Sequence, residues 1–189
     1  GENPNAKSYY ITFSRLEVKG KLMVNQSVST VSGVAWMDHE ISSSQLSEGQ
    51  IGWNWSSLIL DDGSEIMAHV MRRQDGGLDA YSQMHLIDPE GNTTRYSSDQ
   101  FKWSPIDFWT SPRSGARYPI EYSISWIDRE GQTQLLVIRS SPKDQEITGP
   151  ISGFTYYEGA GIVSDENGLE VGKSYTELTG YVESLYGRF

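Results

Sequence analysis

The chain has 189 residues and a mass of 21.2 kDa, which fits one large domain better than two small ones. Its 37% apolar and 21% charged residues exclude general disorder. The absence of cysteine excludes disulfides, but a chain of this length can bury a core without them. A net charge of −10 without a Lys or Arg cluster argues against nucleic acid as a partner, and no apolar run is long enough for a membrane-spanning helix.

Short runs of alternating apolar and polar residues, separated by turn residues, predict about ten or more antiparallel strands and little helix. The expected strands are, in chain order, 9–16, 21–24, 28–36, 53–60, 65–72, 78–87, 93–96, 101–108, 118–127, 134–139, 154–163 and 174–182. Turns are expected at Gly20 and at 25–27, a polar loop at 41–50, and one helical turn at 183–186. This pattern favours a single all-β sheet over residues 9–189, closed into a barrel or folded as a sandwich, after a processed end or linker at 1–8.

The clearest hairpin is centred on Asp62-Gly63, a pair typical of two-residue β-turns. That tip would pair Leu60 with Glu65, Ser56 with His69 and Asn54 with Met71. The resulting mixed face suits a ligand pocket, and it carries Asn54, Ser56, Leu58, Met67, His69 and Met71. In the alternative interpretation, the opposite face with Trp53 and Trp55 is the core and His69 is half exposed. A three-residue loop would shift this register.

The histidines and carboxylates suggest acid–base chemistry more than metal binding. His39, His69 and His85 lack metal-ligand spacing, and no metal or cofactor site is expected. Asp38 and Glu40 flank His39, and a carboxylate can raise the pKa of a neighbouring imidazole and make it a proton donor; the alternative is a solvated strand end. Glu158 and Glu177 lie in aromatic strands, where each is either an acid in an apolar pocket or a carboxylate facing water.

Several segments, in this order, resemble one known family. GVAWMDHE at 33–40 resembles its G-x-A-W-x-D-H signature, and GWNW at 52–55 through LDDG at 60–63 resembles its G-W-D-W hairpin. WTSPRSGARYP at 109–119, DQE at 144–146, YEGA at 157–160 and ELTGY at 177–181 follow. The chain thus resembles the AttH-like, carotenoid 1,2-hydratase (hydroxyneurosporene synthase) group of lipocalin-like proteins.

The resemblance implies a calycin-type β-barrel, in a family whose members usually carry two barrels, and this chain resembles the C-terminal one alone. Members with known chemistry protonate an alkene or fold polyenes, without a cofactor, on a ligand held near the barrel junction. His39 matches the histidine of the hydratases, and His69 lies at or near the position of their proton-donating Asp. Ile41 stands where the hydratases have a Trp, and Asn54 stands where the family usually has an Asp. Both differences argue against carotenoid hydration. Many bacterial members are exported, so the resemblance favours a periplasmic or secreted location.

Three functions follow as hypotheses: a barrel that binds a small apolar ligand such as an isoprenoid, polyene or lipid; an acid-catalysed hydratase, lyase or cyclase; and a half-domain that works only with a second barrel in cis or trans. The candidate catalytic residues are His39, His69, Asp38 and Glu40. The candidate ligand-binding residues are Trp36, Trp53, Asn54, Trp55, Ser56, Met67, Met71, Tyr81, Trp103, Glu158 and Glu177.

Overall fold

The computed structural model describes residues 8–43, 46–149 and 153–188, which form twelve β-strands and no helix. The strands are β1 Ser8–Val24, β2 Ser27–Ser42, β3 Gln50–Leu60, β4 Glu65–Arg73, β5 Gln83–Ile87, β6 Thr93–Ser97, β7 Phe101–Thr110, β8 Arg117–Ile127, β9 Thr133–Ser140, β10 Glu146–Ile147, β11 Tyr156–Ser164 and β12 Glu170–Leu178. The helical turn expected at 183–186 is therefore wrong. The described part of the chain has no helix able to cross a membrane. The predicted processed end lies outside the described residues, except for Ser8, which begins β1.

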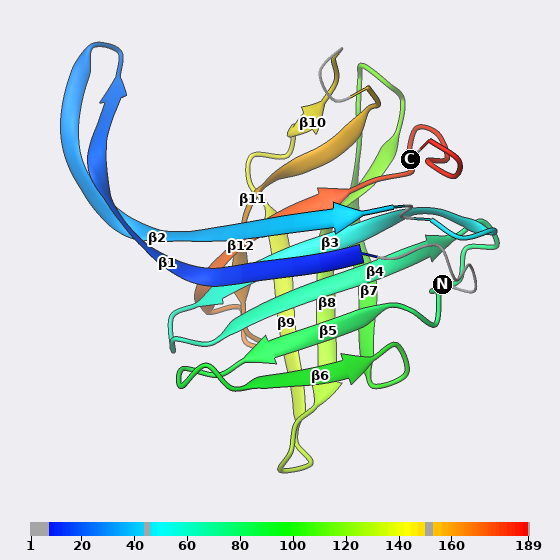
Figure 1. Ribbon diagram of the computed structural model, residues 1–189, viewed down its shortest axis with the longest axis horizontal. Helices are drawn as coiled ribbons and strands as arrows, with labels where there is room; N and C mark the ends of the chain where they lie inside the picture. Colours follow the sequence, from blue (N-terminus) through cyan, green and yellow to red (C-terminus); the bar gives the residue numbers. More distant parts are fainter. Residues whose placement is uncertain (1–7, 44–45, 150–152, 189) are drawn as a thin grey trace.

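β1 and β2 form a two-stranded antiparallel hairpin, here called the arm (residues 8–42), whose far end curves away from the rest of the molecule (Figure 1). The turn predicted at Gly20 is wrong, because β1 continues through this residue and Gly20 pairs with Val31. The reversal comes at Asn25 and Gln26, whose φ angles are 48° and 70°. Two successive left-handed residues are what a type I′ turn requires, so the predicted turn at 25–27 is confirmed.

The other ten strands form one antiparallel sheet in the order β6-β5-β4-β3-β12-β11-β9-β8-β7, with β10 paired to β11. In Figure 1, β3 to β6 run across the view, while β7, β8 and β9 cross behind them at a steep angle. The sheet thus folds over on itself, with the arm in front of its first half. Its two edges, β6 and β7, follow one another through a tight turn at 98–100 and do not pair, so the described sheet is open rather than a closed barrel.

The main core fills the space between the two halves of the sheet, on what we call the inner face. It is apolar and aromatic, and its most deeply buried members are Leu58, Ile66, Val70, Met84, Tyr122, Ile124, Ile138 and Val163. One polar chain crosses this core: the Tyr122 hydroxyl lies 2.6 Å from Ser56 Oγ and 2.8 Å from Thr176 Oγ1. Since buried hydroxyl groups need hydrogen-bond partners, these two hydrogen bonds satisfy all three hydroxyl groups at once.

The β3–β4 hairpin exists as predicted, but its predicted register is wrong by one residue. Leu58 pairs with Ile66, Ser56 with Ala68, and Trp55 with His69. The loop has three residues, because the Leu60 N–H donates to the Ser64 carbonyl at 2.9 Å and Gly63 takes a φ of 93°. This is the loop with a left-handed glycine in its last position. Met67, His69 and Met71 therefore share a face with Trp53 and Trp55, which we call the outer face; Asn54 and Ser56 lie on the inner face.

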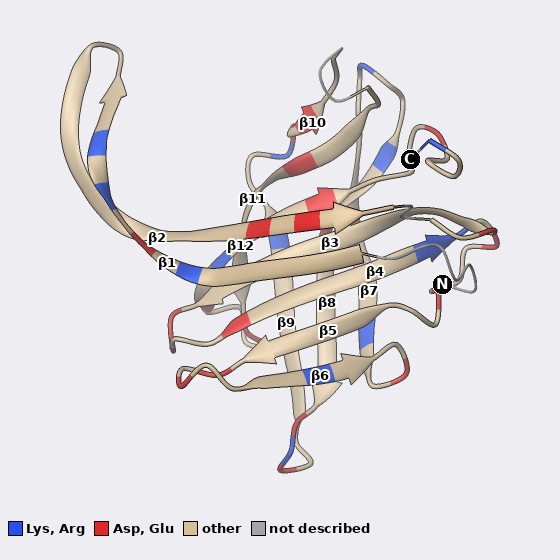
Figure 2. Ribbon diagram, in the orientation of Figure 1, with Lys and Arg blue, Asp and Glu red and all other residues tan. Residues whose placement is uncertain are grey.

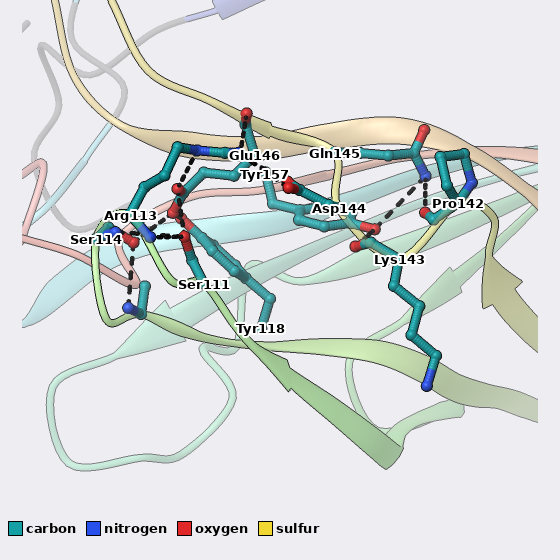
Figure 3. Close-up of polar contacts among 11 residues, drawn as sticks. Ser111, Arg113, Ser114, Tyr118, Pro142, Lys143, Asp144, Gln145, Glu146 and Tyr157 are labelled. Atoms are coloured by element: carbon teal, nitrogen blue, oxygen red, sulfur yellow. Dashed lines mark hydrogen bonds and ion pairs between the residues drawn. The ribbon is translucent and has the colours of Figure 1, made fainter.

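A buried carboxylate fastens the β7–β8 loop to the segment that enters β10 (Figure 3). Glu146 accepts hydrogen bonds from Ser111 at 2.5 Å, from Tyr118 at 3.0 Å and from Ser114. The guanidinium of Arg113 lies 3.3 Å from the same carboxylate. It also donates hydrogen bonds to both carboxylate oxygens of Asp144. Two segments whose contacting residues are 28 to 35 positions apart in sequence are thus held by one charge and its donors.

Candidate functional site

A cleft of about 1070 Å³ lies between the arm and the outer face of the sheet. Its wall on the sheet is aromatic and apolar, with polar side chains among them, and includes Trp53, Trp55, Met67, His69, Met71 and Glu177. The arm contributes the opposite wall, including Tyr10, Thr12, Phe13 and Glu40. A cavity of about 480 Å³ lies beside the cleft and shares Tyr10, Trp55 and Glu177 with it. Volumes of this order suit a small ligand.

Backbone pairing sets four outer-face residues in one row across adjacent strands. Glu158 of β11 pairs with Glu177 of β12, Glu177 pairs with Trp55 of β3, and Trp55 pairs with His69 of β4. Paired residues of antiparallel strands lie about 4.5–5.5 Å apart at Cα and point to the same side. An acid, an indole and an imidazole therefore stand next to one another on the floor of the cleft.

Trp55 occupies the centre of this row and has an unused hydrogen-bond donor. Its side chain is only 9% exposed, and its indole N–H has no acceptor among the described residues. The ring packs edge-on against Trp36 of the arm, with ring centroids 6.1 Å apart. A buried N–H without an acceptor costs about 1–3 kcal/mol.

Glu177 is held in a setting that favours its protonated form. The Trp53 indole N–H donates to Glu177 Oε2 at 3.1 Å. Burial raises the pKa of Glu177 to about 7, against the opposing effect of the Trp53 N–H and with help from the negative charges of Glu158 and Glu40. Figure 2 shows these acidic segments of β2, β11 and β12 gathered in one region. Near neutral pH this carboxyl group therefore carries a proton for a substantial fraction of the time.

His69 has the opposite property. Its side chain lines the cleft, and its ring lies edge-on to Trp53 with centroids 6.4 Å apart. Burial lowers the pKa of His69 to about 4, because the charged imidazolium is poorly solvated there. At neutral pH His69 is therefore a neutral imidazole that can accept a proton. The row thus places a protonated carboxyl group and a neutral base on either side of Trp55.

The arm does not bring Asp38, His39 and Glu40 together as one unit. Asp38 accepts hydrogen bonds from Tyr10 at 2.8 Å and Thr12 at 2.7 Å and lines the smaller cavity, whereas Glu40 lines the cleft. His39 is exposed and lines neither space, because successive residues of a strand point to opposite faces.

The other predicted ligand-binding residues fall into two groups. Those at the cleft or the smaller cavity are Trp36, Trp53, Trp55, Met67, Met71, Tyr81, Glu158 and Glu177. The remaining three lie on the inner face, away from both. Asn54 accepts a hydrogen bond from Tyr181 at 3.0 Å, Ser56 belongs to the buried polar chain, and Trp103 stacks on Tyr122 at 4.8 Å between centroids.

Sequence reasoning missed the arm as a wall of the site. Arg15 on the arm pairs with the buried Glu65 of β4, and this ion pair fastens the arm over the outer face. Tyr10 and Thr12 point at Asp38 from the neighbouring strand. The available signal was the alternation along β1, where Tyr10, Thr12 and Ser14 place hydroxyl groups on one face.

No group of three or more His, Cys, Asp or Glu side chains able to hold a metal ion is present in residues 8–43, 46–149 and 153–188.

Comparison with known proteins places the chain in a family. The profile of the AttH-like family matches residues 1–181. An AttH protein from Nitrosomonas europaea is 34% identical in sequence, with a TM-score of 0.81 over 93% of this chain and 53% of its own. Kievitone hydratase from Nectria haematococca shares the fold at 15% identity, with a TM-score of 0.65 over 92% of this chain and 54% of its own. No curated protein matches. The chain thus spans about half the length of both solved chains, and it belongs to the AttH-like family.

Proposed function

We propose that the chain binds a small, mostly apolar molecule carrying at least one oxygen, such as an isoprenoid, polyene or lipid-like compound, in the cleft under the arm. The observation that carries this proposal is the aromatic floor of the cleft, where Trp53, Trp55, Met67 and Met71 form an apolar surface around a few polar groups. The His69 imidazole, a polar group in the same wall, supports an oxygen on the ligand.

Ligand binding is tested with all-trans-retinol as the probe, followed by energy transfer from tryptophan. Met67→Gln places an amide in the cleft wall and should raise the Kd about tenfold, equivalent to about 1.4 kcal/mol. Met37→Gln is the matched control, because Met37 is an exposed arm residue outside both cavities. His39→Ala should also leave the Kd unchanged. Equal affinities for all variants would contradict binding in this cleft.

A second candidate function is acid-catalysed addition or removal of water, or cyclisation, on an unsaturated apolar substrate. It is favoured by the row that places Glu177 and His69 at the cleft with pKa values shifted in opposite directions. The test is mass spectrometry of polyenes, isoprenoids and fatty acids incubated with the protein. A protein-dependent product that is heavier by one water, or isomeric with its precursor, supports the enzyme; unchanged ligand that co-elutes with the protein supports a carrier.

We also propose that the arm docks on a second lipocalin-like domain, supplied in cis or in trans. More than half of the large hydrophobic side chains that are exposed in the described structure belong to the arm, and Leu22, Met23 and Val28 near its tip are each more than half exposed. Apolar surface of this extent is unusual on a monomer. The N. europaea protein is about twice as long as the part matched here, which leaves room for such a domain.

Docking is tested by titrating the chain with the half of the N. europaea protein that it does not match, and by measuring fluorescence anisotropy. Met23→Glu should abolish binding, whereas Leu169→Glu should not, because Leu169 is equally exposed but lies at the β11–β12 turn. Equal binding by both variants would argue against docking through the arm tip.

We also propose a closed calycin barrel. Closure requires a ladder of backbone hydrogen bonds between β6 and β7, whose ends already meet at the 98–100 turn.

A further inference from the structure

The two ends of the cleft under the arm carry opposite charge. Acidic side chains gather at the β11–β12 end, where Glu158 pairs with Glu177 and the arm adds Asp38 and Glu40. The opposite end, on β5 and β6, has no carboxylate among the described lining residues, but it has Arg95. Figure 2 shows this separation, with red segments on β2, β11 and β12 and a blue segment on β6. A charged group on a ligand would therefore meet fields of opposite sign at the two ends.

The strand register places Arg95 on the floor of the cleft, in line with apolar side chains. Arg95 of β6 pairs with His85 of β5, and His85 pairs with Met67 of β4, so all three point to the outer face. Three interstrand steps of about 5 Å separate β6 from β3, so Arg95 lies about 15 Å from the strand that carries Trp53 and Trp55. The floor thus leads from a cationic end across Met67 to an aromatic surface.

Arg95 has no acidic partner in the described structure. The other arginine that lines the cleft, Arg15, is paired with the buried Glu65, whereas none of the ion pairs among the described residues includes Arg95. Its Nε–H donates to Gln83 Oε1 at 3.1 Å, and its two terminal nitrogens make no hydrogen bond to a described residue. The planar fork of a guanidinium matches the two oxygens of a carboxylate, so these nitrogens are suited to bind one.

We propose that the cleft is selective for an apolar ligand that carries a carboxylate at one end, and that Arg95 binds this carboxylate. The inference rests on the proposed binding of an apolar ligand under the arm, and it adds the charge of the head group and the direction in which the ligand lies. The carboxylate lies at the β5–β6 end, and the apolar part extends over β4 to Trp53 and Trp55. The reverse direction is disfavoured, because it would bring the carboxylate to the acidic end of the cleft.

All-trans-retinoic acid and all-trans-retinol are a suitable pair of probes, because they share the polyene and differ in the head group. At about pH 8 the acid is ionised, and binding of both is followed by energy transfer from tryptophan. Arg95→Gln should raise the Kd for retinoate about fivefold, as expected for a partly exposed ion pair, and leave the Kd for retinol unchanged. About 1 M salt should abolish the same difference in the wild type. Met67→Gln should weaken both ligands equally.

Arg129→Gln is the matched control, since it removes the same charge from an exposed arginine outside the cleft. Arg129 contacts Thr94, the neighbour of Arg95 on β6, whose side chain points to the opposite face. This variant should leave both Kd values unchanged, and thermal melting verifies that each variant is folded. Retinol binding without a specific loss of retinoate affinity in Arg95→Gln, or an equal loss in Arg129→Gln, overturns the assignment of Arg95 and leaves the binding function standing. Failure of the wild type to bind either retinoid overturns both.

Discussion

The Glu146→Gln substitution removes the buried charge that joins the β7–β8 loop to the segment entering β10. The Glu146 side chain has no solvent exposure, and its oxygens accept hydrogen bonds from Ser111, Ser114 and Tyr118. An amide retains one oxygen but turns its N–H₂ group toward hydroxyl groups that now point at it as donors. The substitution therefore disrupts several contacts with a change of only one atom.

The expected loss follows from the burial of the two partners. Removing one partner of a buried ion pair costs about 3–5 kcal/mol, and a hydrogen bond to a charged group contributes about 1.5–3 kcal/mol. Arg113 is 43% exposed and keeps Asp144, so its part of the loss is small. We therefore expect Glu146→Gln to lower the free energy of unfolding by about 2–4 kcal/mol in urea titrations followed by tryptophan fluorescence.

A matched surface pair provides the control. Glu121 binds Arg139, whose side chain is 58% exposed, so Glu121→Gln should cost less than about 1 kcal/mol. Burial alone would raise the pKa of Glu146, but its hydrogen bonds and the charge of Arg113 outweigh burial and lower it. A lowered folded-state pKa stabilises above the unfolded value of about 4.3, and this contribution is lost as the pH falls through the folded pKa. The wild type and Glu146→Gln should therefore converge in acid. A loss below about 1 kcal/mol at pH 7 would refute the argument.

Three further predictions concern other parts of the fold. Gly172→Ala should lower stability by about 1–3 kcal/mol in thermal melts, because its Cβ would lie 2.5 Å from a carbonyl oxygen of β3; Gly20→Ala, with no atom within 4 Å, should be neutral. Arg15→Gln should speed amide exchange in the arm about tenfold, since it removes the cation paired with the buried Glu65; unchanged exchange would mean that this pair does not hold the arm. The lowered pKa of His69 should make stability fall by about 3 kcal/mol as the pH drops from about 6.5 to about 4, and His69→Gln should flatten this slope.

Local sequence rules were sufficient to predict the hairpin at 60–64 but not its strand register. Asp-Gly between two apolar runs correctly predicted two paired strands. The choice between a two-residue and a three-residue loop depends on one backbone hydrogen bond, from Leu60 to Ser64, which no composition rule selects. Because side chains alternate with period two, this single step exchanged the partners of His69 and Met67 and separated Asn54 and Ser56 from them.

Sequence analysis predicted the strands of the arm but not their place outside the main sheet, for a different reason. The alternation in 9–16, 21–24 and 28–36 correctly indicated strands, but Gly20 within a long strand has the same local sequence as Gly20 in a turn. Whether a hairpin lies in the main sheet or outside it depends on which strand edges are available, and that is a tertiary property. The exposed apolar residues of the arm gave no warning, because in sequence they are indistinguishable from core positions.

The position of the cleft follows from what already fills the inner face. Trp103 and Tyr122 stack in the space between the halves of the sheet, together with Leu58 and Ile124, so core side chains occupy this space. The remaining apolar surface lies on the outer face, where the arm covers β3 and β4 and where Leu46 and Leu185 pack against Met71. A ligand held there contacts both the sheet and the arm. A partner bound to the arm tip would therefore contact the same hairpin that forms one wall of the site. From the two proposals we therefore expect binding at the cleft and docking of the arm to be coupled, because both depend on where the same two strands lie.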